Sequence, residues 1–260
     1  MIRSQPFPKK SSTSIGGRWF VVALMLTALT SHATPITFSA ASGTRAAEAT
    51  FVNSGGNLIV TLTNTSTFDV LVPVDVLTAV YFDFSGGSLT RVSALLNSGS
   101  SVYYGPSNGG NVGGEWAYKN GVSGAPFGAN TVITATGLGL VGPTDNFPGE
   151  NLQGPVSVNG LSYGLTSAGD DLLTGNTPVS GGYGLIKNSV VFTLGGFGGL
   201  TDPSLVISNV SFQYGTALTE PVLQVNVPDG GTTVLLLGAA LALLALVSMF
   251  RRRRMVREKS

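Results

Sequence analysis

The sequence contains no cysteine and only one histidine, His32, among its 260 residues. Without cysteine, no disulfide framework can support a folded domain, so the fold must be held together by burial of apolar side chains. Beyond position 32 the chain therefore lacks the residues for Ser-His-Asp and Cys-His nucleophilic mechanisms, and for the usual zinc sites. Carboxylates are the remaining candidates for catalysis.

Charged residues are also scarce, at 10% of the chain, and they are unevenly distributed. Of the fourteen Lys and Arg residues, four lie in the first 18 positions and six in the last ten. The interval from residue 34 to residue 227 has four basic and eleven acidic residues, hence a net charge of about −7. Nucleic-acid binding requires a basic surface, so this composition excludes it. The four basic residues are Arg45, Arg91, Lys119 and Lys187.

The N-terminal segment has the pattern of a secretory signal peptide. Four basic residues, the last of them Arg18, precede an apolar run over residues 19–29. Ser31-His32-Ala33 then supplies the small residues that signal peptidase requires before its cleavage point. We predict removal of residues 1–33 by cleavage after Ala33, which takes away the single histidine.

The C-terminal segment has three successive parts. Val227, Pro228, Asp229, Gly230 and Gly231 form a short polar motif, and the nineteen residues 232–250 that follow carry no charge. As a helix rising about 1.5 Å per residue, this stretch would reach roughly 30 Å, enough to cross the hydrocarbon core of a bilayer. The third part is an arginine cluster, expected to act as a stop-transfer signal on the cytoplasmic side. The cluster consists of Arg251, Arg252, Arg253 and Arg254.

This order of motif, apolar segment and arginine cluster resembles the sorting signal of bacterial exosortase substrates, the PEP-CTERM class, in its VPDSG-CTERM variant. Gly230 stands where that variant has serine, while the Val-Pro-Asp lead and Gly231 keep their positions. The resemblance implies a protein of the cell surface or extracellular matrix, handled by signal peptidase and by a membrane-embedded exosortase transpeptidase. An exopolysaccharide is a candidate partner. The signal covers only the last tenth of the chain and implies nothing about the activity of the rest.

Between these ends the sequence predicts an all-β domain, residues 34–215, and a linker, residues 216–226, before the sorting signal, residues 227–260. About ten β-branched or aromatic runs are separated by turns rich in Gly, Ser, Thr and Asn, with no convincing helix. We expect a single antiparallel β-sandwich, jelly-roll-like in arrangement. The expected strands include residues 58–63, 77–84, 115–119, 131–136, 189–194 and 206–214.

Three hairpins are also expected from turn residues between such runs. The first pairs Phe51 with residues 58–63. The second joins residues 89–95 to residues 101–104. The third joins residues 156–158 to residues 161–165 across Asn159-Gly160, the strongest short hairpin signal in the chain.

A pair of carboxylates at a suitable separation can hydrolyse a glycosidic bond, which makes the acidic residues candidates for catalysis. Glu115 is one candidate because Trp116 and Tyr118 lie beside it, and its potential partners are Asp145, Glu150, Asp170 and Asp171. Nothing in their spacing pairs two of them. Acidic residues on loops that keep the protein soluble are the preferred interpretation, so no enzymatic activity is expected.

Aromatic residues offer a second interpretation. Trp116, Tyr118, Tyr103 and Tyr104 would form a platform for stacking sugar rings if they were exposed together. Aromatic side chains in a sandwich more often fill the core, and that reading is preferred.

Calcium is the one cofactor that the acidic residues suggest. Asp170-Asp171 with Gly175-Asn176, and Asp145-Asn146 with Glu150-Asn151, would supply oxygen ligands. Neither segment matches an EF-hand loop, in which acidic residues recur at alternate positions before a glycine. Polar turns are the preferred reading, and no metal or other cofactor is expected.

The function expected from the sequence is structural or adhesive, at the cell surface or in an extracellular matrix. One alternative is a single-pass anchored protein whose C-terminal tail is never cut. Another is an extracellular carbohydrate-binding module or a carboxylate-dependent glycosidase.

Overall fold

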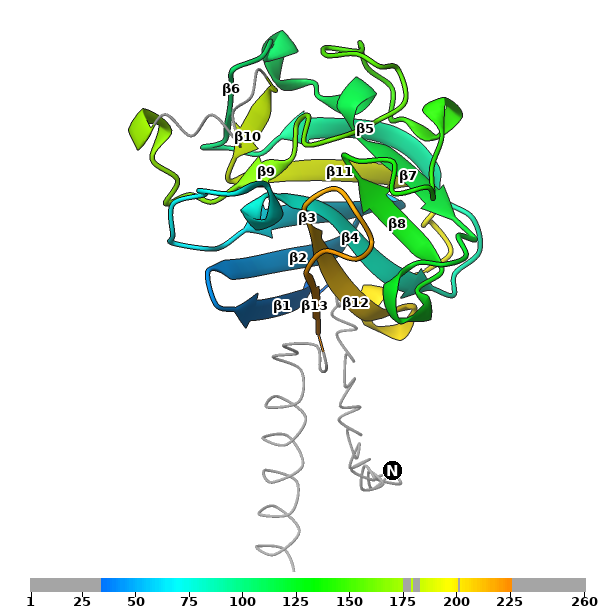
Figure 1. Ribbon diagram of the computed structural model, residues 1–260. Coiled ribbons are helices and arrows are strands. Elements are labelled where there is room, and N and C mark those ends of the chain that lie inside the picture. The colour runs from blue at the N-terminus through cyan, green and yellow to red at the C-terminus, as the bar shows by residue number, and fades with distance from the viewer. Residues whose placement is uncertain (1–33, 175–178, 180–182, 201, 226–260) are drawn as a thin grey trace, which may run out of the picture. The chain divides into compact units, whose positions relative to one another are not determined.

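The computed structural model describes residues 34–174, 179, 183–200 and 202–225 (Figure 1). Ala33, the motif at residues 227–231, the apolar segment and the arginine cluster lie outside these residues, so the expectations placed on them stay predictions. Within the described ranges, no helix is long and apolar enough to cross a membrane.

The described part of the chain is all-β, with strands arranged in two sheets and short 3-10 turns between them. The first sheet has the order β1-β2-β3-β11-β5 and is antiparallel throughout. Its strands are β1 (Ile36–Ser42), β2 (Arg45–Ser54), β3 (Asn57–Asn64), β11 (Ser189–Gly195) and β5 (Thr90–Leu96).

The second sheet follows the order β13-β12-β4-β9-β10-β6, and β8 and β7 extend it beside β4. Its pairs are antiparallel except for β9 and β10, which run parallel. Its strands are β13 (Val222–Gln224), β12 (Ile207–Tyr214), β4 (Leu77–Phe84), β9 (Leu165–Thr166), β10 (Leu185–Lys187), β6 (Ser101–Tyr103), β8 (Thr131–Thr134) and β7 (Ala117–Asn120).

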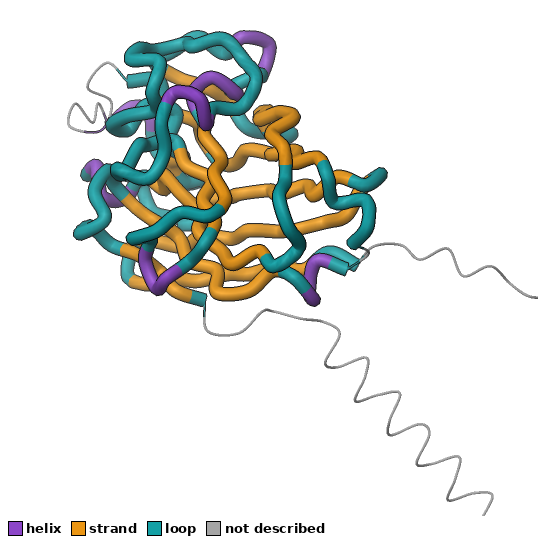
Figure 2. Tube along the Cα trace, turned by 90° about the vertical axis from the view of Figure 1, so that its right-hand side faces the viewer, coloured by secondary structure: helices purple, strands orange, loops and turns teal. Residues whose placement is uncertain are grey.

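The 3-10 turns lie in the loops around the sheets (Figure 2). They are η1 (Pro73–Asp75), η2 (Asn108–Gly110), η3 (Gly113–Glu115), η4 (Pro126–Gly128), η5 (Pro143–Asp145), η6 (Leu172–Thr174) and η7 (Pro203–Leu205).

The hairpin expected around Phe51 is confirmed, as β2 and β3. Gly55 and Gly56 turn the chain with φ of 58° and 80°, which only glycine adopts without strain, and Phe51 pairs with Val60. Alternation along β3 puts Leu58 and Leu62, with Val60, on the buried face.

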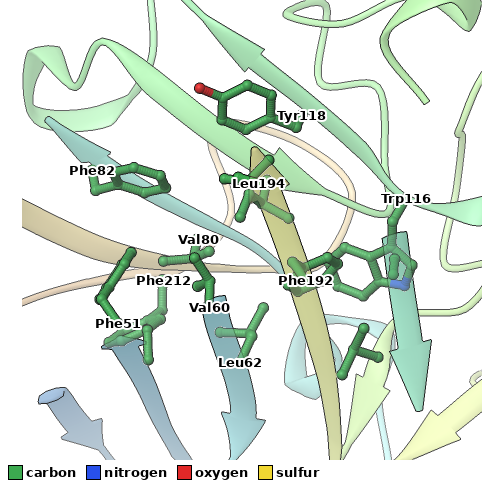
Figure 3. Close-up of a cluster of buried hydrophobic side chains, with 14 of the residues drawn as sticks. Phe51, Val60, Leu62, Val80, Phe82, Trp116, Tyr118, Phe192, Leu194 and Phe212 are labelled. Carbon is green, nitrogen blue, oxygen red and sulfur yellow. The ribbon is translucent and has the colours of Figure 1, made fainter. Parts of the chain in front are cut away.

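The core lies between the two sheets and is built from these alternating apolar residues. Phe51 of the first sheet meets Phe82 of the second edge-on, with ring centroids 5.2 Å apart. In Figure 3, Phe192 and Leu194 of β11 point into the same cluster. Burial of aromatic and aliphatic side chains thus supplies the stability that the absence of disulfides demands.

The outer face of β4 is covered as well, which explains why this strand has no polar alternation. Tyr81 and Val132 are fully buried beneath the loop that carries Ala125 and Ala129, and Leu138 packs against them. Loops of the β7–β8 region therefore form a third layer over part of the second sheet.

The expected hairpin between residues 89–95 and 101–104 is wrong, because these strands belong to different sheets. β5 pairs with β11, and β6 pairs with β10. The chain passes from β5 to β6 and from β10 to β11 at the same corner, so both connections change sheets side by side. At this corner the Asn97 amide and the Ser100 hydroxyl both contact the Ser189 hydroxyl, at 3.1 and 3.2 Å. A corner of this kind keeps local pairing continuous while it changes sheets.

The expected hairpin around Asn159-Gly160 is also wrong, although Gly160 does turn the chain with a φ of 65°. Only Leu165 and Thr166 of this region form a strand, which pairs with β10 and β4. The preceding residues bond elsewhere instead: the Tyr163 amide donates to Gly184 O at 2.6 Å and its hydroxyl to Pro106 O at 2.8 Å. Tertiary contacts override the local turn signal here.

The sheet extends further toward the C-terminus than the predicted boundary at residue 215. Residues 222–224, within the expected linker, form β13 beside β12. The Val225 amide donates to Val210 O at 2.9 Å, so one residue, Asn226, separates the last bonded position from Val227.

Candidate functional site

Glu115 lies at the end of η3, where two glycines allow a loop to pack closely. A Cβ on Gly113 or Gly114 would lie 2.1 Å from Pro148 O or 2.0 Å from Glu150 O, so only glycine fits. The Glu115 side chain, 3% exposed, accepts hydrogen bonds at Oε1 from the amides of residues 152 and 153, at 2.5 and 2.9 Å. Burial raises the pKa of Glu115, against the opposing effect of these amide donors. Glu115 is therefore an anchor for the loop at 148–153.

This anchoring role predicts different effects for two substitutions of Glu115. Ala leaves two amide donors without their acceptor, so we expect a loss of about 1–3 kcal/mol in the free energy of unfolding. Gln retains an acceptor oxygen and removes the charge, so it should cost much less. Urea denaturation of both variants measures the difference, and equal losses would contradict the role.

The raised pKa of Glu115 also predicts a pH dependence. The folded protein holds this proton more tightly than the unfolded chain, so the stabilisation is complete below the ordinary pKa of 4.5 and is lost as pH rises through the folded pKa. We expect the free energy of unfolding to fall with pH over that window, and to fall less in Glu115→Gln. Denaturation curves from about pH 4 to about pH 7 test this, since identical slopes in the two proteins would contradict it.

The four aromatic candidates do not form a common platform. Trp116 is fully buried against Phe192, with ring centroids 5.0 Å apart, and Tyr118 is 3% exposed. Tyr103 and Tyr104 lie together at the end of β6, with ring centroids 5.1 Å apart. The preferred interpretation, aromatic residues filling the core, is thus correct for Trp116 and Tyr118.

Asp170 belongs to a separate buried cluster with Tyr103. Its Oδ1 accepts from the Val70 amide at 3.0 Å, and its Oδ2 accepts from the Tyr103 hydroxyl at 2.7 Å. Burial raises the pKa of both groups. The Lys187 ammonium donates to the Asp170 carbonyl at 2.7 Å, so the backbone of this residue fastens the loop to β10, while its carboxylate fastens the loop to β6 and to the Val70 amide.

The calcium interpretation gains no support from this arrangement. Asp171 donates its amide to Asp69 at 2.9 Å and caps the following turn with its own carboxylate, while Gly175 and Asn176 lie outside the described residues. Among the residues that the structure describes, no group of three or more His, Cys, Asp or Glu side chains is placed to hold a metal ion.

Asp145 occupies a different setting, in an open groove of about 460 Å³ between the two sheets. Its Oδ1 lies 3.6 Å from Nη1 of Arg91 on β5, and its Oδ2 lies 3.7 Å from Nζ of Lys119 on β7. The groove is lined by Ser88, Leu89, Thr90, Arg91, Tyr118, Lys119, Asn120, Asp145, Asn146 and Pro148.

Backbone contacts position the two cations of this groove. The Arg91 guanidinium donates to Tyr118 O at 3.3 Å, and the Lys119 ammonium donates to Leu140 O at 3.0 Å. The Asp145 carboxylate is fixed in turn by the Gly142 amide, at 2.9 Å. Hence the groove has two cations and one carboxylate with defined positions.

Sequence reasoning selected Asp145 and Tyr118 but missed Arg91 and Lys119. The two cations are 28 positions apart and belong to strands of different sheets, so no motif joins them. The one available signal was their rarity, since they are two of only four basic residues between positions 34 and 227. Glu150, the remaining carboxylate candidate, is exposed.

Comparison of this chain with protein-family models, curated proteins and solved structures finds no match. Its function has therefore to be inferred from its own residues.

Proposed function

We propose that this chain is an exported bacterial protein of the cell surface or extracellular matrix, sorted through its C-terminal signal by an exosortase. The observation that carries the proposal is the order of the tail: Val-Pro-Asp-Gly-Gly at 227–231, nineteen uncharged residues, and four consecutive arginines. A stop-transfer signal alone requires the last two parts, whereas the resemblance to a sorting signal rests on the polar motif before them.

The fold is compatible with a chain that enters and leaves its folded domain near membrane segments. β1, which begins three residues after Ala33, contacts β12 and β13, which lead to Val227. The first and last strands of the domain are therefore neighbours. A domain flanked by two apolar segments during export suits this arrangement, because both connections can be short.

The proposed role of the folded domain is structural or adhesive, without enzymatic activity. Glu115, the strongest carboxylate candidate for catalysis, is bound to backbone amides of its own loop. The likeness of the sandwich to a jelly roll stays a prediction, as does delivery by signal peptidase with cleavage after Ala33.

Mass spectrometry of the C-terminus, on protein recovered from its own host, tests the proposal. We expect a chain that ends near Pro228-Asp229, without the apolar segment or with a new group attached. A chain that still ends at Ser260 in the membrane fraction would overturn sorting and leave the tail as a permanent anchor.

A further inference from the structure

We propose that the groove between β5 and β7 is a binding site for an acidic saccharide, a sugar ring that carries a carboxylate. This inference rests on the proposed function in one respect only: a protein of the surface or matrix would meet such polymers. The site itself is argued from the groove's charges, lining and position.

The charge of the groove is the first argument. Arg91 and Lys119 together carry two positive charges, and Asp145 neutralises one of them. The separations of 3.6 and 3.7 Å exceed the 2.7–2.9 Å typical of a direct charge-assisted hydrogen bond. Neither cation therefore forms a short hydrogen bond with Asp145, so a ligand carboxylate can accept hydrogen bonds from both cations.

The donors of the two cations are the second argument. A guanidinium has five N–H donors and an ammonium three, and each of these groups donates one hydrogen bond to a backbone carbonyl. The Arg91 side chain is 32% exposed and that of Lys119 is 43% exposed, so donors remain accessible. A guanidinium also matches the two oxygens of a carboxylate in a bidentate manner.

The remaining lining suits a sugar ring better than a simple ion. Hydroxyl and amide groups on Ser88, Thr90 and Asn120 provide donors and acceptors for ring hydroxyls, and the exposed Pro148 supplies apolar surface for the C–H face. The volume of about 460 Å³ falls within the roughly 300–1,000 Å³ typical of small-molecule sites.

The groove lies at the edge of both sheets, where the chain leaves space for a ligand. β5 is the edge strand of the first sheet, and its far half is covered by a bridge from Leu95 to Asn111. β7 is an edge as well, and its first residue, Ala117, is covered by Asn146. The halves that carry Arg91 and Lys119 line the groove instead.

The charge of the whole domain makes such binding specific. A domain with a net charge of about −7 repels a polyanion over most of its surface, unlike a basic protein that binds any acidic polymer. At physiological salt this repulsion is screened beyond about 8 Å, while contacts within the groove persist. Binding of an acidic saccharide would therefore depend on the two cations of the groove, Arg91 and Lys119.

Titration calorimetry on the full chain, purified in detergent at physiological salt, tests the assignment. The probes are an oligomer of galacturonic acid, a neutral glucose oligomer of equal length, and a sulfated dextran. We expect binding of the galacturonate oligomer, and weaker or no binding of the other two. Absence of galacturonate binding, or equal affinity for the neutral or the sulfated sugar, would overturn the proposal.

Two groove variants separate binding from a structural role of the ion pairs. Lys119→Gln should weaken galacturonate binding about tenfold, since a hydrogen bond to a charged group contributes roughly that much. Asp145→Asn keeps an acceptor for Gly142 and raises the net charge of the groove, so binding should be tighter. If both variants weakened binding alike, with equal losses of thermal stability, the pairs would be structural and the proposal wrong.

Ser98→Asp serves as the charge-matched control, because it adds one negative charge at an exposed turn beyond the opposite end of β5. Its affinity for galacturonate should equal that of the wild type. A loss of affinity equal to that of Lys119→Gln would show that only the total charge of the domain matters, which would overturn the assignment of the groove as the binding site. These measurements do not depend on how the C-terminus is processed, so failure of binding and failure of sorting are distinguishable.

Discussion

Trp116→Ala is expected to lower the free energy of unfolding by about 3–5 kcal/mol, the cost typical of removing a large aromatic side chain from a core. Trp116 is fully buried, and its ring packs against Phe192 with centroids 5.0 Å apart. Truncation would leave a cavity between η3, β7 and the first sheet. In a domain with no disulfide, such a loss is a large fraction of the total stability, typically 5–15 kcal/mol.

Phe68→Ala provides the matched control, because the Phe68 side chain is 55% exposed. It should change the free energy of unfolding by less than about 1 kcal/mol. Denaturant unfolding of both variants, followed by tryptophan or tyrosine fluorescence and circular dichroism, measures the two values. If Trp116→Ala were as stable as Phe68→Ala, Trp116 would not be part of the core.

A third variant separates packing from polarity at this position. The indole Nε1 of Trp116 has no hydrogen-bond partner among the described residues. Trp116→Phe removes that N–H and retains most of the aromatic contact with Phe192, so it should cost less than half as much as Trp116→Ala. A loss as large as that of Ala would indicate that the N–H itself is bonded in solution.

The fold class could be predicted from the sequence because local patterns decide it. Alternation in β3 and the mostly apolar run of β4 indicate strands whatever their neighbours are, and Gly55-Gly56 turns the chain at the expected place. Strand partners are a different matter. β5 pairs with β11, almost a hundred positions away, because buried side chains such as Ala94 and Phe192 face the same core.

The turn signals show why the two wrong hairpins failed. Asn159-Gly160 favours a tight turn but does not specify what its flanks pair with. Leu161 and Tyr163 are buried against other segments, and the energy of that burial exceeds the gain from a short local ladder. Sequence spacing alone carries no information on such long-range contacts.

The groove could not be predicted for the same reason. Its charged members come from β5, β7 and η5, and they meet only once two sheets are packed at their edges. Glu115, by contrast, was selected on its neighbours Trp116 and Tyr118, but Trp116 packs in the core and Glu115 itself binds the amides of its own loop. Glu115 ends η3 and Tyr118 lies on β7, so closeness in sequence did not bring them to a shared site.

Asp229→Ala is expected to abolish processing of the tail, so that the chain ends at Ser260 and stays in the membrane fraction. Under the proposed topology, Asp229 lies just before the apolar segment, three positions from its start at residue 232. A carboxylate cannot enter the hydrocarbon core cheaply, so it would hold the motif at a fixed depth for a membrane-embedded protease. Alanine removes both that constraint and the charge that the protease would recognise.

Glu258→Ala is the control, because it removes one negative charge from the other side of the apolar segment. It should be processed like the wild type, as shown by mass spectrometry of the C-terminus and by the share of protein in the membrane fraction. Processing of Asp229→Ala at the wild-type rate would show that the protease does not recognise the motif through this residue.

The proposed cleavage also places a demand on the folded domain. Because Val225 is bonded to the sheet and only Asn226 intervenes, a protease that cut near Val227 would also have to approach the β12–β13 edge of that domain. Insertion of a flexible Gly-Ser segment after Asn226 should therefore leave cleavage intact or accelerate it, whereas loss of cleavage would mean that the sheet edge itself is part of the recognised surface.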